Sequence, residues 1–203
     1  ISHRPITDAL RYQATSHLRY RAGAEATPSA LQRNLQLPPN SNPRTRQMAQ
    51  EWLTKPELRD APPAHKVQAA LALLRTGGYT YTLQPGTTGP DPADTFWFDS
   101  KQGFCEHIAN AFVVLMRGMQ VPARIVTGYQ GGELNPVDGM WTVRQSDAHA
   151  WAEVWLPEQG WVRVDPTAAV SSTRADTSTR LEPPRGAVGE AIATLSPGFA
   201  TAL

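Results

Sequence analysis

The residues of this chain whose types and order could do chemistry are one cysteine, one histidine and one aspartate. Cys105 is the single cysteine among 203 residues, so it cannot form an internal disulfide. It stands in the run Gly103-Phe104-Cys105-Glu106-His107, and the apolar periodicity from Ile108 to Met119 predicts a helix that begins at this cysteine. Backbone N–H groups and the helix dipole stabilise an anion in a first helical turn. The sequence therefore favours a thiol nucleophile at Cys105 over the alternative, a small buried hydrophobic residue.

His149 and Asp165 fall on two predicted strands downstream, which supply the base and orienter that such a nucleophile needs. Residues 149–156 and 161–165 alternate in a way that predicts an antiparallel hairpin. The register that pairs the two tryptophans beside the turn puts His149 diagonal to Asp165 on the same face. A shift by one residue would put them on opposite faces. The pattern therefore predicts a histidine–aspartate pair, but it does not show that Cys105 lies beside it.

The same register accounts for other polar and aromatic residues of the hairpin. It places Glu153 opposite Arg163, and we expect this pair to brace the hairpin rather than to take part in chemistry. Core and cross-strand packing is the expected role of the nearby tryptophans, and any that is exposed would be a candidate wall of a substrate groove. These tryptophans are Trp141, Trp151, Trp155 and Trp161.

A metal site is not expected. Cys105, His107 and His149 do not have the spacing of zinc ligands, and no acidic loop has calcium-ligand spacing. Side chains two residues apart on a helix do not face each other, so His107 is a poor base for the thiol. We expect it on the helix surface or behind the site. For the oxyanion, the Cys105 N–H is one natural donor, and Trp97 and Gln102 are the alternatives for a second.

The composition and charge of the chain argue against several classes of protein. The net charge of +1 argues against nucleic acid as the main partner, and no apolar run approaches the ~20 residues that span a bilayer. No signal peptide is visible. Because the chain begins at Ile1, we expect it to be an excised or processed segment. One cysteine is compatible with either cytoplasm or periplasm.

We expect one domain over residues 1–203, with an N-terminal arm (1–40), a catalytic core (41–170) and a C-terminal tail or linker (171–203). Residues 23–37 and 84–95 are predicted to be loops, and Asn135–Gly139 a turn. The other expected elements are helices at Pro43–Leu53 and Ala64–Leu74, and strands at Tyr79–Leu83, Ala123–Gln130 and Met140–Gln145.

Three segments carry a resemblance to a known family. GFCEHIANAFVVLMRGMQVPARIVTGY, DAHAWAEVW and GWVRVDPTAAV, in this order, closely resemble the transglutaminase-like core of bacterial membrane-anchored transglutaminases of the TgpA type. The resemblance covers about Tyr79 to Val170. The implied fold is α+β, a papain-like core in which a helix bearing the thiol packs on an antiparallel sheet bearing histidine and aspartate.

The resemblance also implies roles and a location. Carried over by position, Cys105 is the nucleophile, His149 the base and Asp165 the orienter, and no cofactor, metal or calcium is expected. The domain would face the periplasm at the inner membrane, with its parent protein anchored by segments outside this chain.

The reaction expected is acyl transfer from a protein glutamine side chain to a primary amine, through a thioester on Cys105. The acceptor would be a lysine or a diamino acid of cell-wall peptide. A cysteine peptidase or amidase would use the same three residues with water as acceptor. An arylamine N-acetyltransferase shares the Cys-His-Asp order, although the surroundings of Cys105 do not resemble that family. A non-catalytic module that binds peptides or cell-wall fragments is the remaining alternative.

Overall fold

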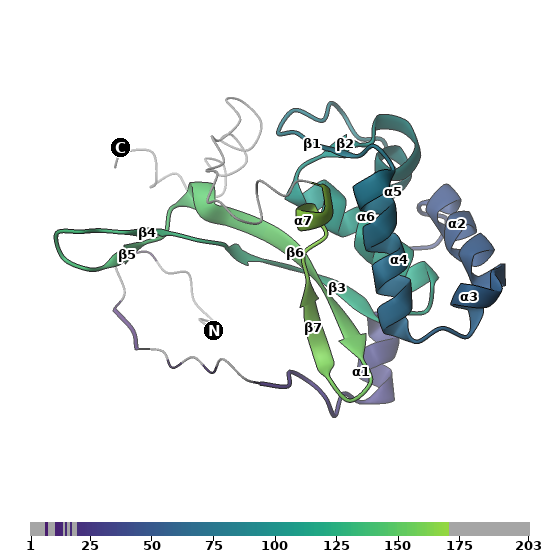
Figure 1. Cartoon of the computed structure of the whole chain (residues 1–203), viewed down its shortest axis with the longest axis horizontal. Coiled ribbons are helices and arrows are strands. Elements are labelled where there is room, and N and C mark those ends of the chain that lie inside the picture. Colours follow the sequence, from purple (N-terminus) through teal and green to yellow (C-terminus); the bar gives the residue numbers. More distant parts are fainter. Residues whose placement is uncertain (1–6, 8–10, 14, 16, 18–19, 171–203) are drawn as a thin grey trace.

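The computed structural model describes residues 7, 11–13, 15, 17 and 20–170, and its helices gather on one side of an antiparallel sheet (Figure 1). The predicted tail, residues 171–203, lies outside the described residues. The helices are α1 (Pro28–Arg33), α2 (Pro43–Thr54), α3 (Pro56–Arg59), α4 (Pro63–Thr76), α5 (Pro92–Asp94), η1 (Thr95–Ser100), α6 (Cys105–Gly118), η2 (Gln145–Asp147) and α7 (Thr167–Val170). The strands are β1 (Thr80–Tyr81), β2 (Gln102–Gly103), β3 (Ala123–Tyr129), β4 (Glu133–Leu134), β5 (Trp141–Thr142), β6 (Ala148–Leu156) and β7 (Gly160–Val164).

Helix α6 forms the centre of the core. It begins at Cys105, as its apolar periodicity predicts, and it contacts β3 and β6 as well as α2, α4 and α5. A helix surrounded in this way must be apolar on most of its faces. Ile108, Phe112 and Leu115 are accordingly fully buried. The start of this helix is therefore held rigidly against the sheet.

The main sheet has the strand order β3-β6-β7 and is antiparallel throughout. Along β6 buried and partly exposed residues alternate, and Ala150, Ala152 and Val154 lie on the buried face. The predicted hairpin register is confirmed, because Trp155 pairs with Trp161. It fixes which residues of β6 and β7 share the other face.

A two-stranded ribbon, β4–β5, connects β3 to β6 and extends away from the helices (Figure 1). The predicted turn at its tip is confirmed, since the Gly139 N–H donates to the Asn135 carbonyl at 2.9 Å. The strand expected at Met140–Gln145 is shorter than predicted, because only Trp141–Thr142 pairs. Its neighbours Met140 and Val143 are exposed.

The expected loop at residues 23–37 was wrong in part, because Pro28–Arg33 forms α1. The Thr27 hydroxyl accepts a hydrogen bond from the Ala30 N–H at 3.3 Å, and Pro28 occupies the first helical position. Both features favour a helix start. The arm also contacts the core, since the Trp161 N–H donates to the Ala22 carbonyl at 2.7 Å.

Two further expectations need correction near the cysteine. The strand expected at Tyr79–Leu83 is reduced to β1, which pairs with β2 in parallel, immediately before Cys105. The end of the expected loop at 84–95 forms α5, and this helix continues into the π-helical turn η1. The apolar run Phe96–Phe98 is therefore helical, and two of its aromatic rings are buried.

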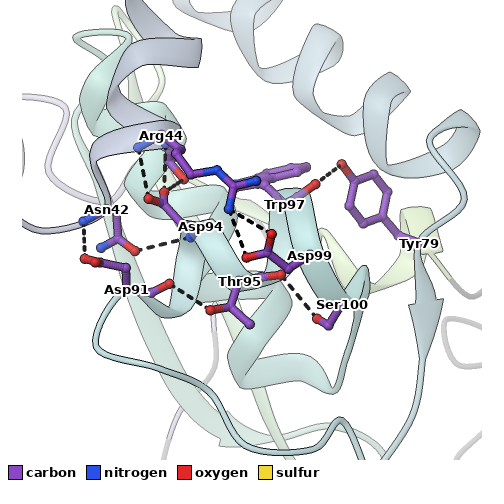
Figure 2. Close-up of polar contacts among 10 residues, drawn as sticks. Asn42, Arg44, Tyr79, Asp91, Asp94, Thr95, Trp97, Asp99 and Ser100 are labelled. Atoms are coloured by element: carbon purple, nitrogen blue, oxygen red, sulfur yellow. Dashed lines mark hydrogen bonds and ion pairs between the residues drawn. The ribbon is translucent and has the colours of Figure 1, made fainter.

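A polar network joins the start of α2 to the start of α5 (Figure 2). The Asp94 carboxylate accepts hydrogen bonds from the N–H groups of Arg44 and Thr45, at 2.9 and 2.7 Å, and from the Thr45 hydroxyl at 2.6 Å. The Asn42 backbone N–H donates to the Asp91 carboxylate at 2.6 Å, and the Asn42 side-chain oxygen Oδ1 accepts from the Asp94 N–H at 3.3 Å. Each helix thus supplies caps for the other's unpaired N–H groups.

Aromatic residues continue this network toward α6. The Tyr79 hydroxyl donates to the Trp97 carbonyl at 3.1 Å, as Figure 2 shows, and the Trp97 indole N–H donates to the Ala111 carbonyl in α6 at 3.0 Å. Burial raises the pKa of Tyr79 to about 12, so its hydroxyl stays a donor. The segment that leads to Cys105 is therefore fixed to Tyr79, which follows α4, and to α6.

Candidate active site

Cys105 is the first residue of α6, as predicted, and its residue surface is 4% exposed. The preceding Phe104 is extended, so the chain turns sharply into the helix. The turn requires glycine at Gly103, because a Cβ there would lie 2.6 Å from the Cβ of His107. The local sequence thus places the thiol at a helix N-terminus, where backbone N–H groups favour an anion.

His149 and Asp165 are in direct contact. His149 Nε2 lies 2.7 Å from Asp165 Oδ2, and the two side chains are 8% and 19% exposed. His149 is the second residue of β6, and Asp165 follows directly after β7. The other carboxylate oxygen of Asp165 accepts a hydrogen bond from the Thr167 N–H at 3.2 Å, which fixes the carboxylate plane.

The thiol of Cys105 is also a partner of His149. Burial alone lowers the pKa of His149, but hydrogen bonding and charge interactions with Asp165 and Cys105 outweigh it and raise the pKa to about 9. The structure therefore brings together all three residues that the sequence singled out. At neutral pH this environment favours a protonated imidazole.

The pKa of Asp165 is held below its usual value. Burial opposes this shift, but the hydrogen bond and charge of His149, the charge of Arg163 and the Thr167 N–H together outweigh it. Arg163 Nη2 lies 3.6 Å from Asp165 Oδ2. The carboxylate therefore stays ionised beside the imidazole.

The geometry assigns different partners to the two ring nitrogens of His149. Because Nε2 contacts Asp165, Nδ1 is the nitrogen left for the thiol. An imidazole held in this way can pass a proton between the sulfur and a leaving or attacking group, while the carboxylate fixes its orientation. The arrangement is suited to thiol-based acyl transfer or hydrolysis.

Of the two candidates for a second oxyanion donor, Trp97 is ruled out. Its ring is 2% exposed, and its N–H is already bonded to the Ala111 carbonyl. Gln102, in β2 and exposed, lies three residues before Cys105. Gln102 therefore remains the candidate, together with the Cys105 N–H.

His107 is half-buried, close to the expectation of a residue behind the site. Its ring lies edge-on to Phe104 at 4.4 Å between centroids, and its Nδ1 is buried without a hydrogen-bond partner. Burial lowers the pKa of His107 although Glu106 acts in the opposite direction. It is therefore held neutral at neutral pH.

The charged pair expected to brace the hairpin forms differently. Glu153 is opposite Arg163 in the register, but its ion pair is with Arg124 on β3, at 2.6 Å. Arg163 instead donates to Gln130 at 2.7 Å and contacts Asp165. The contact between Arg163 and Asp165 could have been predicted from the sequence, because these residues are two positions apart and share a strand face.

The four tryptophans near the hairpin differ in their exposure to solvent. Trp141, on the ribbon, is 68% exposed and is the candidate groove wall, whereas Trp151, Trp155 and Trp161 are only partly exposed.

Within the part of the chain that the structure describes, no group of three His, Cys, Asp or Glu side chains is placed to hold a metal ion. None of the described helices combines the length and apolar character needed to cross a membrane.

The fold and the arrangement of thiol, imidazole and carboxylate define a papain-like α+β core, and comparison with known proteins gives the family. The model of the transglutaminase-like superfamily matches residues 49–166. The chain belongs to this superfamily. The predicted resemblance and fold class are thereby confirmed.

Relatives in two bacteria support this assignment. A protein-glutamine gamma-glutamyltransferase of Pseudomonas aeruginosa is 43% identical over 172 residues, which is 85% of this chain and 25% of that protein. An uncharacterised protein of Bacillus subtilis is 36% identical over 121 residues, 56% of this chain and 16% of its own length. This chain thus spans a quarter or less of either relative.

A solved structure matches as well. The periplasmic domain of TgpA from Pseudomonas aeruginosa is 44% identical and superimposes with a TM-score of 0.71, over 76% of this chain and 52% of that domain. The chain therefore corresponds to about half of the solved domain.

Proposed function

We propose that this chain is the catalytic domain of a protein-glutamine gamma-glutamyltransferase, with Cys105 as nucleophile, His149 as acid and base, and Asp165 as orienter. The observation that carries the proposal is the 2.7 Å contact between His149 and Asp165, together with the hydrogen-bond and charge interaction of the Cys105 thiol with the same imidazole. The similarity to the Pseudomonas transferase supports the choice of reaction. Since both partners of the imidazole are anionic or acidic groups, it is poised to hold a proton.

In the first step the Cys105 thiolate attacks the carboxamide carbon of a glutamine side chain. The C–N bond breaks, and the proton held on His149 goes to the departing ammonia, which leaves a thioester. The Cys105 N–H stabilises the oxyanion, and Gln102 is proposed as the second donor. The site's burial keeps the thiol–imidazole pair away from bulk water.

In the second step a primary amine attacks the thioester carbonyl. His149 takes the proton of the incoming amine, the C–S bond breaks, and the thiolate is regenerated. Water in place of the amine would convert glutamine to glutamate. The same residues thus serve both outcomes, and the acceptor decides between them.

The acyl donors are proposed to be protein glutamines, and the acceptors protein lysines or the diamino acid of cell-wall peptide. The similarity to a periplasmic domain supports a location at the periplasmic face of the inner membrane. The parent protein would then be anchored by segments outside this chain. No metal or organic cofactor enters either step.

The test is mass-resolved turnover of a glutamine-containing protein with a labelled primary amine, wild type beside Cys105→Ala. The proposal predicts amine incorporation that is absent from the variant. Deamidation or chain cleavage without incorporation would instead indicate a hydrolase. Incorporation that persists in Cys105→Ala would overturn the thiol mechanism.

A further inference from the structure

Arg163, Trp151 and His149 form a stack of side chains at the candidate site. The guanidinium of Arg163 lies 4.2 Å from the centre of the Trp151 ring. That indole lies nearly parallel to the imidazole of His149, with 6.2 Å between ring centroids and 24° between planes. An arginine over an aromatic face is held by cation–π attraction. Trp151 is therefore the shared neighbour of Arg163 and of the ring of His149.

Arg163 also reaches past the indole to the carboxylate. Its Nη2 lies 3.6 Å from Asp165 Oδ2, which is the same oxygen that contacts His149 Nε2 at 2.7 Å. The Nη2 group donates a hydrogen bond to Gln130 Oε1 at 2.7 Å. Gln130 and Trp151 thus fix the guanidinium from two directions, with its charge directed at one carboxylate oxygen.

The chain makes room for this stack at Gly128. A Cβ at this position would lie 2.9 Å from Cη2 of Trp151, closer than such atoms approach in folded proteins. Gly128 is the register partner of His149 across β3 and β6. The glycine therefore lets the indole lie flat beside the histidine.

We propose that Arg163 is a positioning residue: it keeps the Asp165 carboxylate ionised and turned toward His149, and it thereby extends the active pH range on the acid side. The inference rests on the proposed function only in assigning catalytic roles to Cys105, His149 and Asp165.

Few other charges act on this carboxylate. Three groups face the Asp165 carboxylate: His149 from β6, Arg163 from β7 and the Thr167 N–H from α7. Cys105 acts on the carboxylate only through His149. The acid nearest to Arg163 across the ladder, Glu153, is already paired with Arg124. The Arg163 charge is therefore directed to Asp165. If it is removed, the carboxylate should accept a proton at a higher pH and release the imidazole.

Arg124 supplies a matched control on the same sheet. Its guanidinium lies 4.2 Å from the Trp161 ring, and its side chain is 42% exposed against 44% for Arg163. Its carboxylate partner, however, is Glu153 rather than Asp165. Arg124→Gln alone would free Glu153, the cross-strand neighbour of Arg163, so the control also carries Glu153→Gln. This Arg124→Gln control removes an equivalent stack and ion pair and leaves no free carboxylate beside Arg163.

The experiment measures the rate of Cys105 alkylation by iodoacetamide as a function of pH, at low ionic strength. It compares the wild-type domain with Arg163→Gln, Arg163→Lys and the Arg124→Gln control that also carries Glu153→Gln. Alkylation requires no glutamine substrate, so it tests this inference even if no amine incorporation is found. pH profiles of kcat/KM for amine incorporation, measured in parallel, test whether the rise in rate on the acid side of the alkylation profile (its acid limb) also governs turnover.

The acid limb of both profiles should move to higher pH in Arg163→Gln by about half a pH unit, a value reduced for solvent exposure. Arg163→Lys retains the charge and should keep the wild-type limb, as should the Arg124→Gln control. Added salt should reduce the difference between Arg163→Gln and wild type. Profiles of Arg163→Gln that overlay the wild type, or an equal shift in the Arg124→Gln control, would overturn the proposal.

Discussion

At the scale of single residues, the imidazole of His149 has a partner at each nitrogen. Asp165 lies 2.7 Å from Nε2, which leaves Nδ1 for the interaction of His149 with the Cys105 thiol. Because these partners together raise the pKa of His149 to about 9, the ring can hold its proton at neutral pH. A protonated ring beside the thiol stabilises the thiolate that would attack a carboxamide.

Asp165→Asn tests the orienter role. The amide can still pack beside His149, but it no longer stabilises the imidazolium and favours the wrong tautomer. We expect an intact fold by circular dichroism and a fall in kcat on the order of 10³-fold. Near-normal turnover in this variant would reduce Asp165 to a structural residue.

The two shifted pKa values also predict how stability depends on pH. The folded pKa of His149 is raised from 6.5 to about 9, so its contribution is complete below pH 6.5 and is lost as the pH rises through about 9. The folded pKa of Asp165 is lowered from 3.8, so its contribution is complete above 3.8 and is lost as the pH falls through the lowered value. Their joint contribution is therefore greatest between about 3.8 and 6.5.

Urea unfolding across this pH range measures the effect. We expect the free energy of unfolding of wild type to decline between pH 6.5 and about 9, and His149→Gln to remove that decline. An identical decline in the variant would assign the slope to other groups.

At the scale of elements, the starts of α2 and α5 cap each other, and α5 continues through η1 toward Cys105. Asp94 is 4% exposed and accepts three hydrogen bonds from Arg44 and Thr45. Arg44 also pairs with Asp99, but that pair is about half exposed on both sides. Burial thus distinguishes two carboxylates in one network, and the buried one should matter more.

Asp94→Ala should lower the free energy of unfolding by about 2–3 kcal/mol, because it leaves buried N–H groups without acceptors. Asp99→Ala, which removes the exposed partner of Arg44, should cost no more than about 0.5 kcal/mol. Urea midpoints of the two variants provide the comparison. Equal losses would contradict the assignment of the network's stability to Asp94.

The elements that carry the site were predictable because their patterns are long and regular. The helix from Cys105 and the hairpin register of β6 and β7 follow from apolar periodicity and cross-strand pairing. The π-helical turn η1 was not predictable, since its Phe-Trp-Phe run has no strand or helix period by itself. It is helical because the capped α5 continues into it and because α6 accepts the Trp97 N–H.

The candidate triad was predictable as a set of residues, whereas its surroundings were not. The register placed His149 near Asp165, but long side chains choose among several neighbours in three dimensions. Glu153 therefore pairs with Arg124 on a strand that the hairpin pattern did not include. Arg163 likewise binds Gln130, which directly follows the end of β3, and the hairpin pattern does not include that strand.

At the scale of the whole molecule, the N-terminal segment is part of the packed structure from about residue 22 onward. The Trp155 indole N–H donates to the Gly23 carbonyl at 3.0 Å, and the Ala123 N–H donates to the Asn34 carbonyl at 3.1 Å. Arg117 donates to the Gln36 carbonyl at 2.8 Å. This segment therefore contacts both edges of the main sheet and the end of α6.

Removal of residues 1–37 should therefore destabilise the domain rather than trim a free arm. The lost hydrogen bonds and the exposed edge of β7 suggest a fall in the free energy of unfolding of about 2–5 kcal/mol. Thermal unfolding of the truncated chain and of the 203-residue chain measures it. An unchanged midpoint would show that the segment is dispensable, in line with an arm separate from the core.

The measurement that tests the central claim most directly is the intact mass of the domain, acid-quenched after incubation with a blocked glutamine peptide and no amine. We predict an adduct on Cys105 equal to the peptide minus ammonia, which disappears when a primary amine is added before the quench. Amine incorporation that proceeds with the acyl group on another residue, or in Cys105→Ala, would contradict the account.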